Sequence, residues 1–278
     1  MYIELNDNNQ NLRHHNMRIE QMIRLLLIAG VFFSTSIFAN DHNNSFAGMD
    51  LAEGNSLQLN LCELLPDKSM ADYEKVFSAY VKWSKQNDVE VYAMRAMPMF
   101  GGPDATAPIQ YQFVDMLAAP YSVSGEAWDK WLGTKEGQRL NRLWQETAKC
   151  RVTVNPVFVR FADQEALKGD TRVMTINWCT RHEGVSTAQL IAKHDAVLAS
   201  RPDNSTVAAW SVMGTGLGSR NAPGDFAHLL SFRNAADLMA YQNSLANEEG
   251  WRIRQDYETS YASCTGENVY QLQVLNRP

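Results

Sequence analysis

Several motifs that would indicate a particular function are missing from this sequence. Its four cysteines form no Cys-x-x-Cys pair, and there is no Gly-x-Ser-x-Gly or His-Glu-x-x-His motif. A zinc ribbon, a thioredoxin-type centre, a serine-hydrolase elbow and a zincin site are therefore not indicated. Basic residues are also outnumbered by acidic ones, 25 against 31, which gives a net charge of −6. Because nucleic-acid affinity depends on Lys and Arg meeting phosphates, we expect no nucleic-acid partner.

The N-terminal segment contains a continuous apolar run. Arg18 and Arg24 precede an apolar stretch at residues 25–33, and small residues then lead to Ala39. This is the layout of a secretory signal peptide, and the stretch is too short for a comfortable transmembrane span. We expect cleavage after Ala39, a periplasmic or secreted protein, and no stable membrane span after cleavage. An uncleaved anchor is the alternative.

The rest of the chain contains an internal repeat. Asn60 stands two residues before Cys62, and Asn177 stands two residues before Cys179. Each pair is followed by a polar loop and then by an amphipathic helix pattern. Such self-similarity over about a hundred residues predicts a domain duplication. The expected segments are an N-terminal extension and signal peptide at 1–39, a polar lead-in at 40–56, a first half at 57–163 and a second half at 170–278.

Both halves show the same order of strand and helix patterns. The first half reads strand, helix, strand, strand, helix and strand over residues 57–64, 69–86, 89–100, 109–119, 124–148 and 150–160. The second half repeats this order over residues 172–180, 187–199, 206–214, 225–232, 234–262 and 269–275. The long helix of the first half is expected to break near Gly133 or Gly137. Each half is thus a ferredoxin-like β-α-β-β-α-β unit, and the predicted fold class is α+β.

The ferredoxin-like topology also predicts how the cysteines pair. In its sheet the last strand runs antiparallel beside the first, so the end of strand 1 lies next to the start of strand 4. Cys62 and Cys179 end the first strands, whereas Cys150 and Cys264 stand at the start of the last strands. The predicted disulfides are therefore Cys62–Cys150 and Cys179–Cys264. Two disulfides fit an exported chain and leave no thiol as a nucleophile.

Two such units in tandem resemble the dimeric α/β-barrel superfamily, with both protomers fused into one chain. That superfamily includes antibiotic-biosynthesis-type monooxygenases, haem-degrading monooxygenases and chlorite dismutase-like proteins. The resemblance rests on element order and duplication over about residues 57–275. It implies a pseudo-dimeric α/β barrel in which two sheets face each other and pockets lie between each sheet and its own helices. We therefore expect a monomer.

The repeated asparagines are the first candidates for a site. Asn60 and Asn177 share the face of their strand with the cysteine two residues on, because alternate strand residues point the same way. A buried amide needs partners, since an unpaired one costs about 1–3 kcal/mol. The resemblance suggests a role like that of the strand-1 Asn in haem-degrading members. The alternative is a structural Asn bonded to loop backbone.

Two histidines are the candidate catalytic residues. His194 lies on the apolar stripe of its helix, where the first half has Phe77. An imidazole with a pKa near neutrality could act there as a general base or an iron ligand. His228 alternates with apolar residues along its strand and aligns with Asp115, which indicates a titratable group at one place in both halves. A structural core histidine and a half-buried strand-edge histidine are the respective alternatives.

An aromatic interior suited to a flat or apolar ligand is indicated by the seven tryptophans. The candidate ligand-binding residues are Asn60, Asn177, Asp115, Trp178 and Trp210. No metal site is predicted, because no neighbouring residue completes a ligand set with His182 and Glu183. The cofactor is unknown. A haem would need His194 or His228, because neither second long helix contains the His on which haem-degrading members rely.

The leading hypothesis is an exported protein that binds a small apolar or aromatic ligand between sheet and helices, with the better site in the second half. The first alternative is a cofactor-independent or haem-linked monooxygenase-like enzyme, in which a pocket His deprotonates an aromatic substrate and an Asn orients it. The second alternative is a non-catalytic protein-interaction module.

Overall fold

The computed structural model describes residues 45–101 and 111–278. The predicted signal peptide lies outside the described residues, as do positions 40–44 of the predicted lead-in. The remainder of that lead-in begins with a small hairpin of β1 (Ser45–Phe46) and β2 (Met49–Asp50). Met49 of this hairpin is buried in the barrel core. The lead-in therefore contributes to packing as well as connecting.

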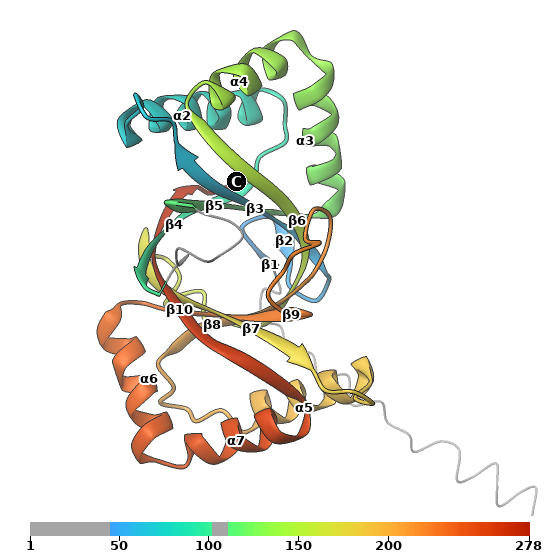
Figure 1. The fold of residues 1–278 in the computed structure, drawn as a ribbon, viewed down its shortest axis with the longest axis vertical. Coiled ribbons are helices and arrows are strands. Elements are labelled where there is room, and N and C mark those ends of the chain that lie inside the picture. The colour runs from blue at the N-terminus through green and yellow to red at the C-terminus, as the bar shows by residue number, and fades with distance from the viewer. Residues whose placement is uncertain (1–44, 102–110) are drawn as a thin grey trace, which may run out of the picture. The chain divides into compact units, whose positions relative to one another are not determined.

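Eight strands of the described residues close into an antiparallel barrel (Figure 1). They are β3 (Asn55–Leu64), β4 (Tyr92–Phe100), β5 (Phe113–Ala119), β6 (Ala148–Ala162), β7 (Thr171–Arg181), β8 (Val207–Gly214), β9 (Phe226–Phe232) and β10 (Ala262–Asn276). Their order around the barrel is β10-β4-β5-β3-β6-β8-β9-β7. In each half the last strand pairs antiparallel with the first, β6 with β3 and β10 with β7. The predicted α+β fold of two fused ferredoxin-like halves is confirmed.

Helices cover the outer face of each half of the barrel (Figure 1). They are α2 (Met70–Gln86), α3 (Tyr121–Gly133) and α4 (Lys135–Gln145) in the first half, and α5 (Thr187–Ala199), α6 (Ala235–Asn247) and α7 (Gly250–Ser260) in the second. Capping boxes of Ser69 with Asp72 and of Ser186 with Gln189 begin α2 and α5. Each box pairs backbone N–H groups that a helix start leaves without partners. In the part of the chain that the structure describes, no helix has the length and apolar character needed to cross a bilayer.

Both long helices are divided in two, and the sequence predicted only one of the breaks. The first-half helix ends at Gly133, as expected, and α4 starts after Thr134. The prediction of one continuous helix over 234–262 is wrong, because Glu248 adopts an extended backbone between α6 and α7. A Cβ atom on Gly250 would lie 3.0 Å from the carbonyl oxygen of Ser244. Glycine at this position therefore lets α7 begin close against the end of α6.

The apolar side chains form one core inside the barrel and others under the helices. Alternation along the strands sends Leu59 and Ile176 into the barrel interior, where strands of both halves contribute. Under α2–α4 a single large cluster fills the space between sheet and helices. Under α5–α7 the packing is divided into two smaller clusters, one around Phe226 and one around Phe232. The two halves share a fold but differ in how fully their helical layer is packed.

Both disulfides join residues that face each other across neighbouring strands. Cys62 is bonded to Cys150 and Cys179 to Cys264, as the topology predicted. Each pair is also a directly opposed pair in the strand register. One covalent link per half therefore ties the first strand of that half to its last.

Candidate functional site

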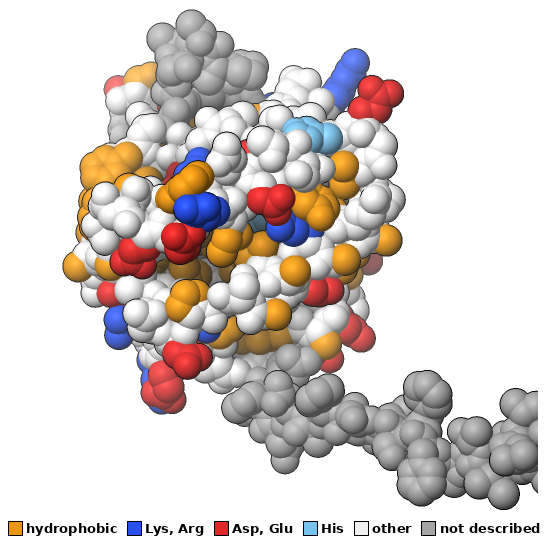
Figure 2. Space-filling view, turned by 90° about the horizontal axis from the view of Figure 1, so that it is seen from below, with side chains coloured by type: hydrophobic (Ala, Val, Ile, Leu, Met, Phe, Trp, Pro, Cys, Tyr) orange, Lys and Arg blue, Asp and Glu red, His pale blue; other side chains and the backbone are white. Residues whose placement is uncertain are grey.

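The second half contains a cavity of about 760 Å³ between its strands and α5, α6 and α7. Figure 2 looks onto this end of the protein and shows apolar side chains recessed among acidic and basic ones. Leu230, Leu245 and Ile253 contribute apolar surface to the cavity, and Arg201 and Glu248 belong to its charged lining. A cavity of this size, mostly apolar with a few polar groups, is typical of a small-molecule site.

The cavity exists because the second half lacks the aromatic side chains that fill the same place in the first. There Tyr80 and Trp83 of α2 pack against Trp131 and Trp144 of α3 and α4. Counted from the capping serines, Val197 of α5 takes the position of Tyr80, and Ser200, the residue that follows α5, takes that of Trp83. Counted from the start of the helix, Leu245 of α6 takes the position of Trp131. All three smaller residues line the cavity.

A chain of four ring side chains lies at one wall of the cavity. The hydroxyl of Tyr257 lies 2.9 Å from Nε2 of His194 and 3.0 Å from Nε2 of His228. The Nε1 atom of Trp210 lies 3.1 Å from Nδ1 of His228. These residues come from α7, α5, β9 and β8, so four separate elements place them. His194 and His228, both predicted as site residues, are thus brought together, with ring centres 5.1 Å apart.

The direction of every hydrogen bond in this chain follows from the indole. The Trp210 Nε1–H group can only donate, so Nδ1 of His228 accepts. A neutral His228 then carries its proton on Nε2 and donates to the Tyr257 oxygen. The Tyr257 hydroxyl donates in turn to Nε2 of His194, whose proton resides on Nδ1. Proton donation runs from Trp210 through His228 and Tyr257 to His194.

Both imidazoles are neutral near pH 7. Burial lowers the pKa of His194 to about 4, and the nearby positive charge of Arg160 adds to this while Asp195 opposes it. Burial also lowers the pKa of His228 to about 3, with His194 as the next cause. The pKa of the Tyr257 hydroxyl is raised by burial. The cluster therefore contains no charge. Nε2 of His194, which accepts the hydrogen bond of the Tyr257 hydroxyl, can also accept its proton.

Replacing His194 by Phe, the first-half residue, is expected to flatten the acid dependence of stability. His194 has a folded pKa of about 4 against about 6.5 in an unfolded chain. Between these values the unfolded state binds more protons, so the wild type loses stability as the pH falls. The variant should reduce this slope by up to about 1.4 kcal/mol per pH unit. Urea unfolding at several pH values in this window measures it.

The control for this variant is Ile191→Phe, which adds a phenylalanine at an exposed position of the same helix and removes no titratable group. It should keep the slope of the wild type. Equal slopes for His194→Phe and the wild type would contradict a depressed pKa at His194.

The other predicted site residues of the second half have different surroundings. Asn177 lines the cavity, but its Oδ1 accepts a hydrogen bond of 3.1 Å from the backbone N–H of Gly266, at an irregularity of β10. Its amide thus supports the strand pairing. Trp178 lies on the opposite face of β7 and packs against the barrel interior, away from this cavity. Trp210 lines the cavity and also orients His228.

Asp115 lines neither this cavity nor the smaller cavity of the first half, in contrast to the interpretation from sequence. Its side chain is fully buried, and Arg95 Nε donates to its Oδ1 at 2.8 Å. The Tyr73 hydroxyl donates to its Oδ2, also at 2.8 Å. Although Arg95 and Tyr73 act to lower the pKa of Asp115, burial outweighs them and raises it. The place that His228 occupies in the second half is thus taken in the first by a closed, ion-paired cluster.

Asn60 lies in a separate and smaller cavity of the first half, of about 160 Å³. The sequence reasoning identified Asn60 but missed its neighbours Gln58 and Trp128, and it missed Tyr257 in the other cavity. Gln58 could have been found, because it lies two residues before Asn60 on the same strand face. Tyr257 carried no comparable signal, since the face of α7 that meets the sheet depends on the break at Glu248.

Hydrogen bonds within the protein occupy three of the four imidazole nitrogens of His194 and His228 that could ligate a haem iron. In residues 45–101 and 111–278 no group of three or more His, Cys, Asp or Glu side chains is placed to hold a metal ion. Both ring nitrogens of His228 are bonded within the protein, and so is Nε2 of His194. Axial ligation through any of these atoms would have to break the chain of hydrogen bonds.

The topology defines the class of protein as a tandem α/β barrel. No model of a known protein family and no curated protein sequence matches the chain. Similar solved structures include a provisionally named monooxygenase from Lactobacillus acidophilus NCFM (10% identity, 81% of this chain, 100% of that chain, TM-score 0.47). A second is chlorite dismutase from Candidatus Nitrospira defluvii in complex with imidazole (8% identity, 79% of this chain, 91% of that chain, TM-score 0.44). A third is an anthrone oxidase-like protein (14% identity, 81% of this chain, 93% of that chain, TM-score 0.47). At these identities and TM-scores the matches carry no conclusion about activity.

Proposed function

We propose that the second-half cavity binds a small, largely apolar aromatic molecule with an acidic hydroxyl group and removes its proton. The observation that carries the proposal is the Tyr257 hydroxyl held between the two neutral imidazoles of His194 and His228 at the wall of the cavity. The apolar lining would hold the aromatic body, and the Tyr257 oxygen would meet the hydroxyl. This corresponds to the enzyme alternative in which a pocket His deprotonates an aromatic substrate.

The hydrogen-bond directions give a route for the proton. The Tyr257 oxygen accepts from His228 and keeps one lone pair, which can accept the substrate O–H. Tyr257 passes its own proton to Nε2 of His194 and keeps the proton of the substrate. His194 becomes an imidazolium with protons on both nitrogens, and the substrate becomes an anion. His228, oriented by Trp210, donates throughout and positions the Tyr257 oxygen.

The basicity of His194 decides which hydroxyl suits the site. With a pKa of about 4, His194 is a weak base. Each unit by which the pKa of the substrate exceeds that of the base opposes transfer by about 1.4 kcal/mol. Attraction between the new imidazolium and the anion in a buried site offsets this cost when the hydroxyl is acidic enough. An acidic phenol or enol therefore fits better than an aliphatic alcohol.

Binding without proton transfer is the second candidate function. The low pKa of His194 favours binding alone. A ligand that gains no negative charge cannot stabilise a protonated His194, so the cluster would stay neutral. For both candidates we propose an exported protein. The predicted signal peptide and the two disulfides support this, since disulfides persist in oxidising compartments.

Leu245 of α6 stands at the position that Trp131 has in α3, so a tryptophan placed there should fill the cavity and test the proposed site. Leu245→Trp is expected to weaken binding of 4-nitrophenol at least about tenfold, because the indole would occupy space that Leu245 leaves open. Isothermal titration calorimetry on the full chain measures the dissociation constant.

Ile191→Trp is the matched control for this variant. Ile191 is exposed on α5 and does not line the cavity, so its replacement adds a tryptophan without filling the site. Unchanged binding in Leu245→Trp, or an equal loss in Ile191→Trp, would place the phenol elsewhere.

A further inference from the structure

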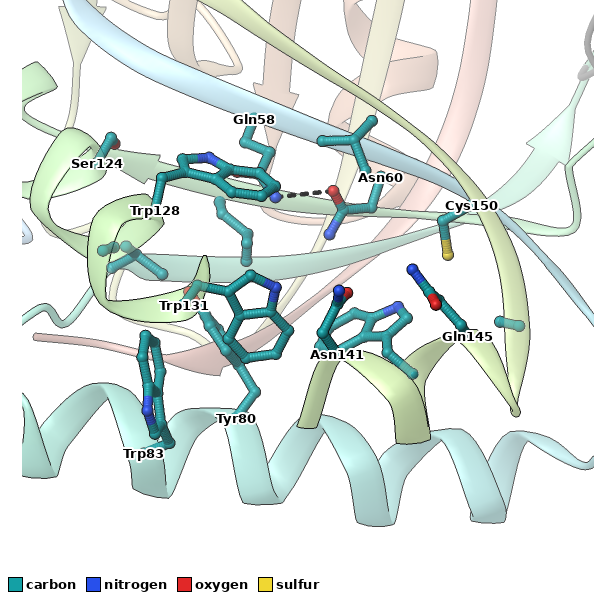
Figure 3. Close-up of a pocket in the computed structure, with 16 residues that line it drawn as sticks. Gln58, Asn60, Tyr80, Trp83, Ser124, Trp128, Trp131, Asn141, Gln145 and Cys150 are labelled. Atoms are coloured by element: carbon teal, nitrogen blue, oxygen red, sulfur yellow. Dashed lines mark hydrogen bonds between the residues drawn. The ribbon is translucent and has the colours of Figure 1, made fainter. Parts of the chain in front are cut away.

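The first-half cavity, about 160 Å³ in volume, has a chemical character different from the second. Its lining contains no Asp, Glu, Lys, Arg or His side chain. Its polar groups are mainly carboxamides, and its walls are mainly indole rings (Figure 3). A cavity without charged groups offers nothing to offset the desolvation of an ion, so it excludes charged molecules.

The orientation of the buried amides follows from one obligate donor. The Nε1–H group of Trp128 donates to Oε1 of Gln58 at 3.0 Å, since an indole cannot accept. The amide nitrogen of Gln58 is therefore on the other side, where it donates to Oδ1 of Asn60 at 2.9 Å. That bond leaves the Nδ2 group of Asn60 facing away from Gln58. The chain from Trp128 to Asn60 thus ends in an N–H donor.

This terminal donor has no protein partner among the described residues. Asn60 is only 4% exposed, and no hydrogen bond from its Nδ2 is present. In Figure 3 its amide nitrogen points into the cavity, toward Asn141. The equivalent Asn177 accepts from the Gly266 N–H at the irregularity of β10, whereas β6 pairs with β3 opposite Asn60 without interruption. Asn60 therefore has no backbone-supporting role of that kind, and its donor is available for a ligand.

The opposite wall is suited to a flat molecule. Trp131 and Trp144 line the cavity together with the amides of Asn141 and Gln145, which come from α4 (Figure 3). Indole rings offer large apolar faces to a planar group. An engineered protein cavity of about 150 Å³ accepts benzene, which gives the scale of a molecule that fits here.

We propose that the first-half cavity is a second binding site, for a small, flat, uncharged carbonyl compound. The Asn60 Nδ2 group donates to the carbonyl oxygen, and the planar body lies against Trp131 and Trp144. This site is independent of the proton-transfer cluster in the second half, from which it differs in volume, charge and polar groups. The chain would then carry two sites of different specificity on two copies of one fold.

Three probes of the same heavy-atom skeleton test the proposal by calorimetry on the full chain. Acetophenone carries the carbonyl acceptor, cumene lacks it, and benzoate adds a charge. Acetophenone is expected to bind at least about tenfold more tightly than cumene or benzoate. Asn60→Leu should bring its affinity to that of cumene. Leu245→Trp, which fills the other cavity, should leave the affinity for acetophenone unchanged.

Gln58→Glu is the second variant, and it keeps the shape of the site. At a pH at which the new carboxyl group at position 58 is ionised, it can only accept, so Asn60 would turn its Nδ2 group toward residue 58 and its oxygen toward the cavity. Acetophenone should then lose its advantage over cumene. Equal binding of acetophenone and cumene to the wild type, tighter binding of benzoate, or full acetophenone affinity in both Asn60→Leu and Gln58→Glu would overturn the proposal.

Discussion

Replacing Arg95 by Met is expected to lower the free energy of unfolding by about 3–5 kcal/mol near neutral pH. Arg95 and Asp115 form an ion pair in which both side chains are buried, with Nε and Oδ1 2.8 Å apart. Removing only the cation leaves a carboxylate in the core with Tyr73 as its remaining side-chain partner. The chain must then bury an unpaired charge or protonate Asp115, and both cost free energy. Urea unfolding near pH 7 measures the loss.

The pH dependence of this loss separates the charge from simple loss of packing. Burial already raises the pKa of Asp115 with Arg95 present, and without the cation it should rise further. The loss of unfolding free energy in Arg95→Met is then greatest at a pH at which an unpaired Asp115 would be charged. It becomes smaller as the pH falls and Asp115 becomes neutral. Lys75→Met, which removes the exposed partner of Asp72, is the matched control and should leave stability unchanged. A loss that is small at neutral pH, or identical in acid, would contradict the role assigned to the ion pair.

Removing the first-half disulfide should have a similar effect. The variant with Cys62→Ala and Cys150→Ala is expected to lose about 4–5 kcal/mol of unfolding free energy in the chain-entropy model. The bond closes a loop with a sequence separation of 88, and the second-half bond closes one of 85. The two double variants should therefore lose nearly equal amounts. Denaturant unfolding of both, compared with the oxidised wild type, measures this.

A marked difference between the two disulfides would point to a local cause. If only the variant without Cys62 and Cys150 lost unfolding free energy, the cause would be the packing of the large first-half cluster around these residues, not loop closure. A loss below about 1 kcal/mol in both variants would contradict the entropic account.

The repeat allowed the fold to be predicted from sequence. The Asn-x-Cys strands, followed by helices whose capping residues Ser69 and Ser186 lie at the same distance from the cysteines, predict two equal units. Once the units are ferredoxin-like, the strand order determines which cysteines meet. The break at Glu248 was missed although the repeat encodes it, because Gly250 lies close to the Ser244 carbonyl just as Gly137 lies close to the Trp131 carbonyl in the first half.

The site was predicted less completely, because equivalent residues acquired different partners. Asp115 and His228 stand at the same register position, each opposite the Asn of its own first strand. The neighbouring strand offers Arg95 to the first and Val212 to the second. A carboxylate beside a guanidinium closes into an ion pair, whereas an imidazole beside a valine is left to bond with Tyr257 and Trp210. The pattern of β5 and β9 alone could not predict this difference, because the partners of Asp115 and His228 come from other strands and helices.

The two cavities illustrate how a duplicated fold can diverge. In the first half, large aromatic side chains leave a small neutral space beside Asn60. In the second half, Val197, Ser200 and Leu245 leave a larger space beside the two histidines. Both halves have the same order of strands and helices, so side-chain volume and the partners of one buried strand position account for most of the difference between the sites.

The absorption spectrum of bound 4-nitrophenol tests the central claim most directly. Its phenolate absorbs visible light and its neutral form does not, so the spectrum reports where the proton is. At a pH below the solution pKa of the probe, the wild type is expected to develop the phenolate band on binding, and Tyr257→Phe is expected to bind the probe without that band. A bound probe that stays neutral in the wild type, or a phenolate band of equal strength in Tyr257→Phe, would contradict proton transfer through Tyr257 to His194.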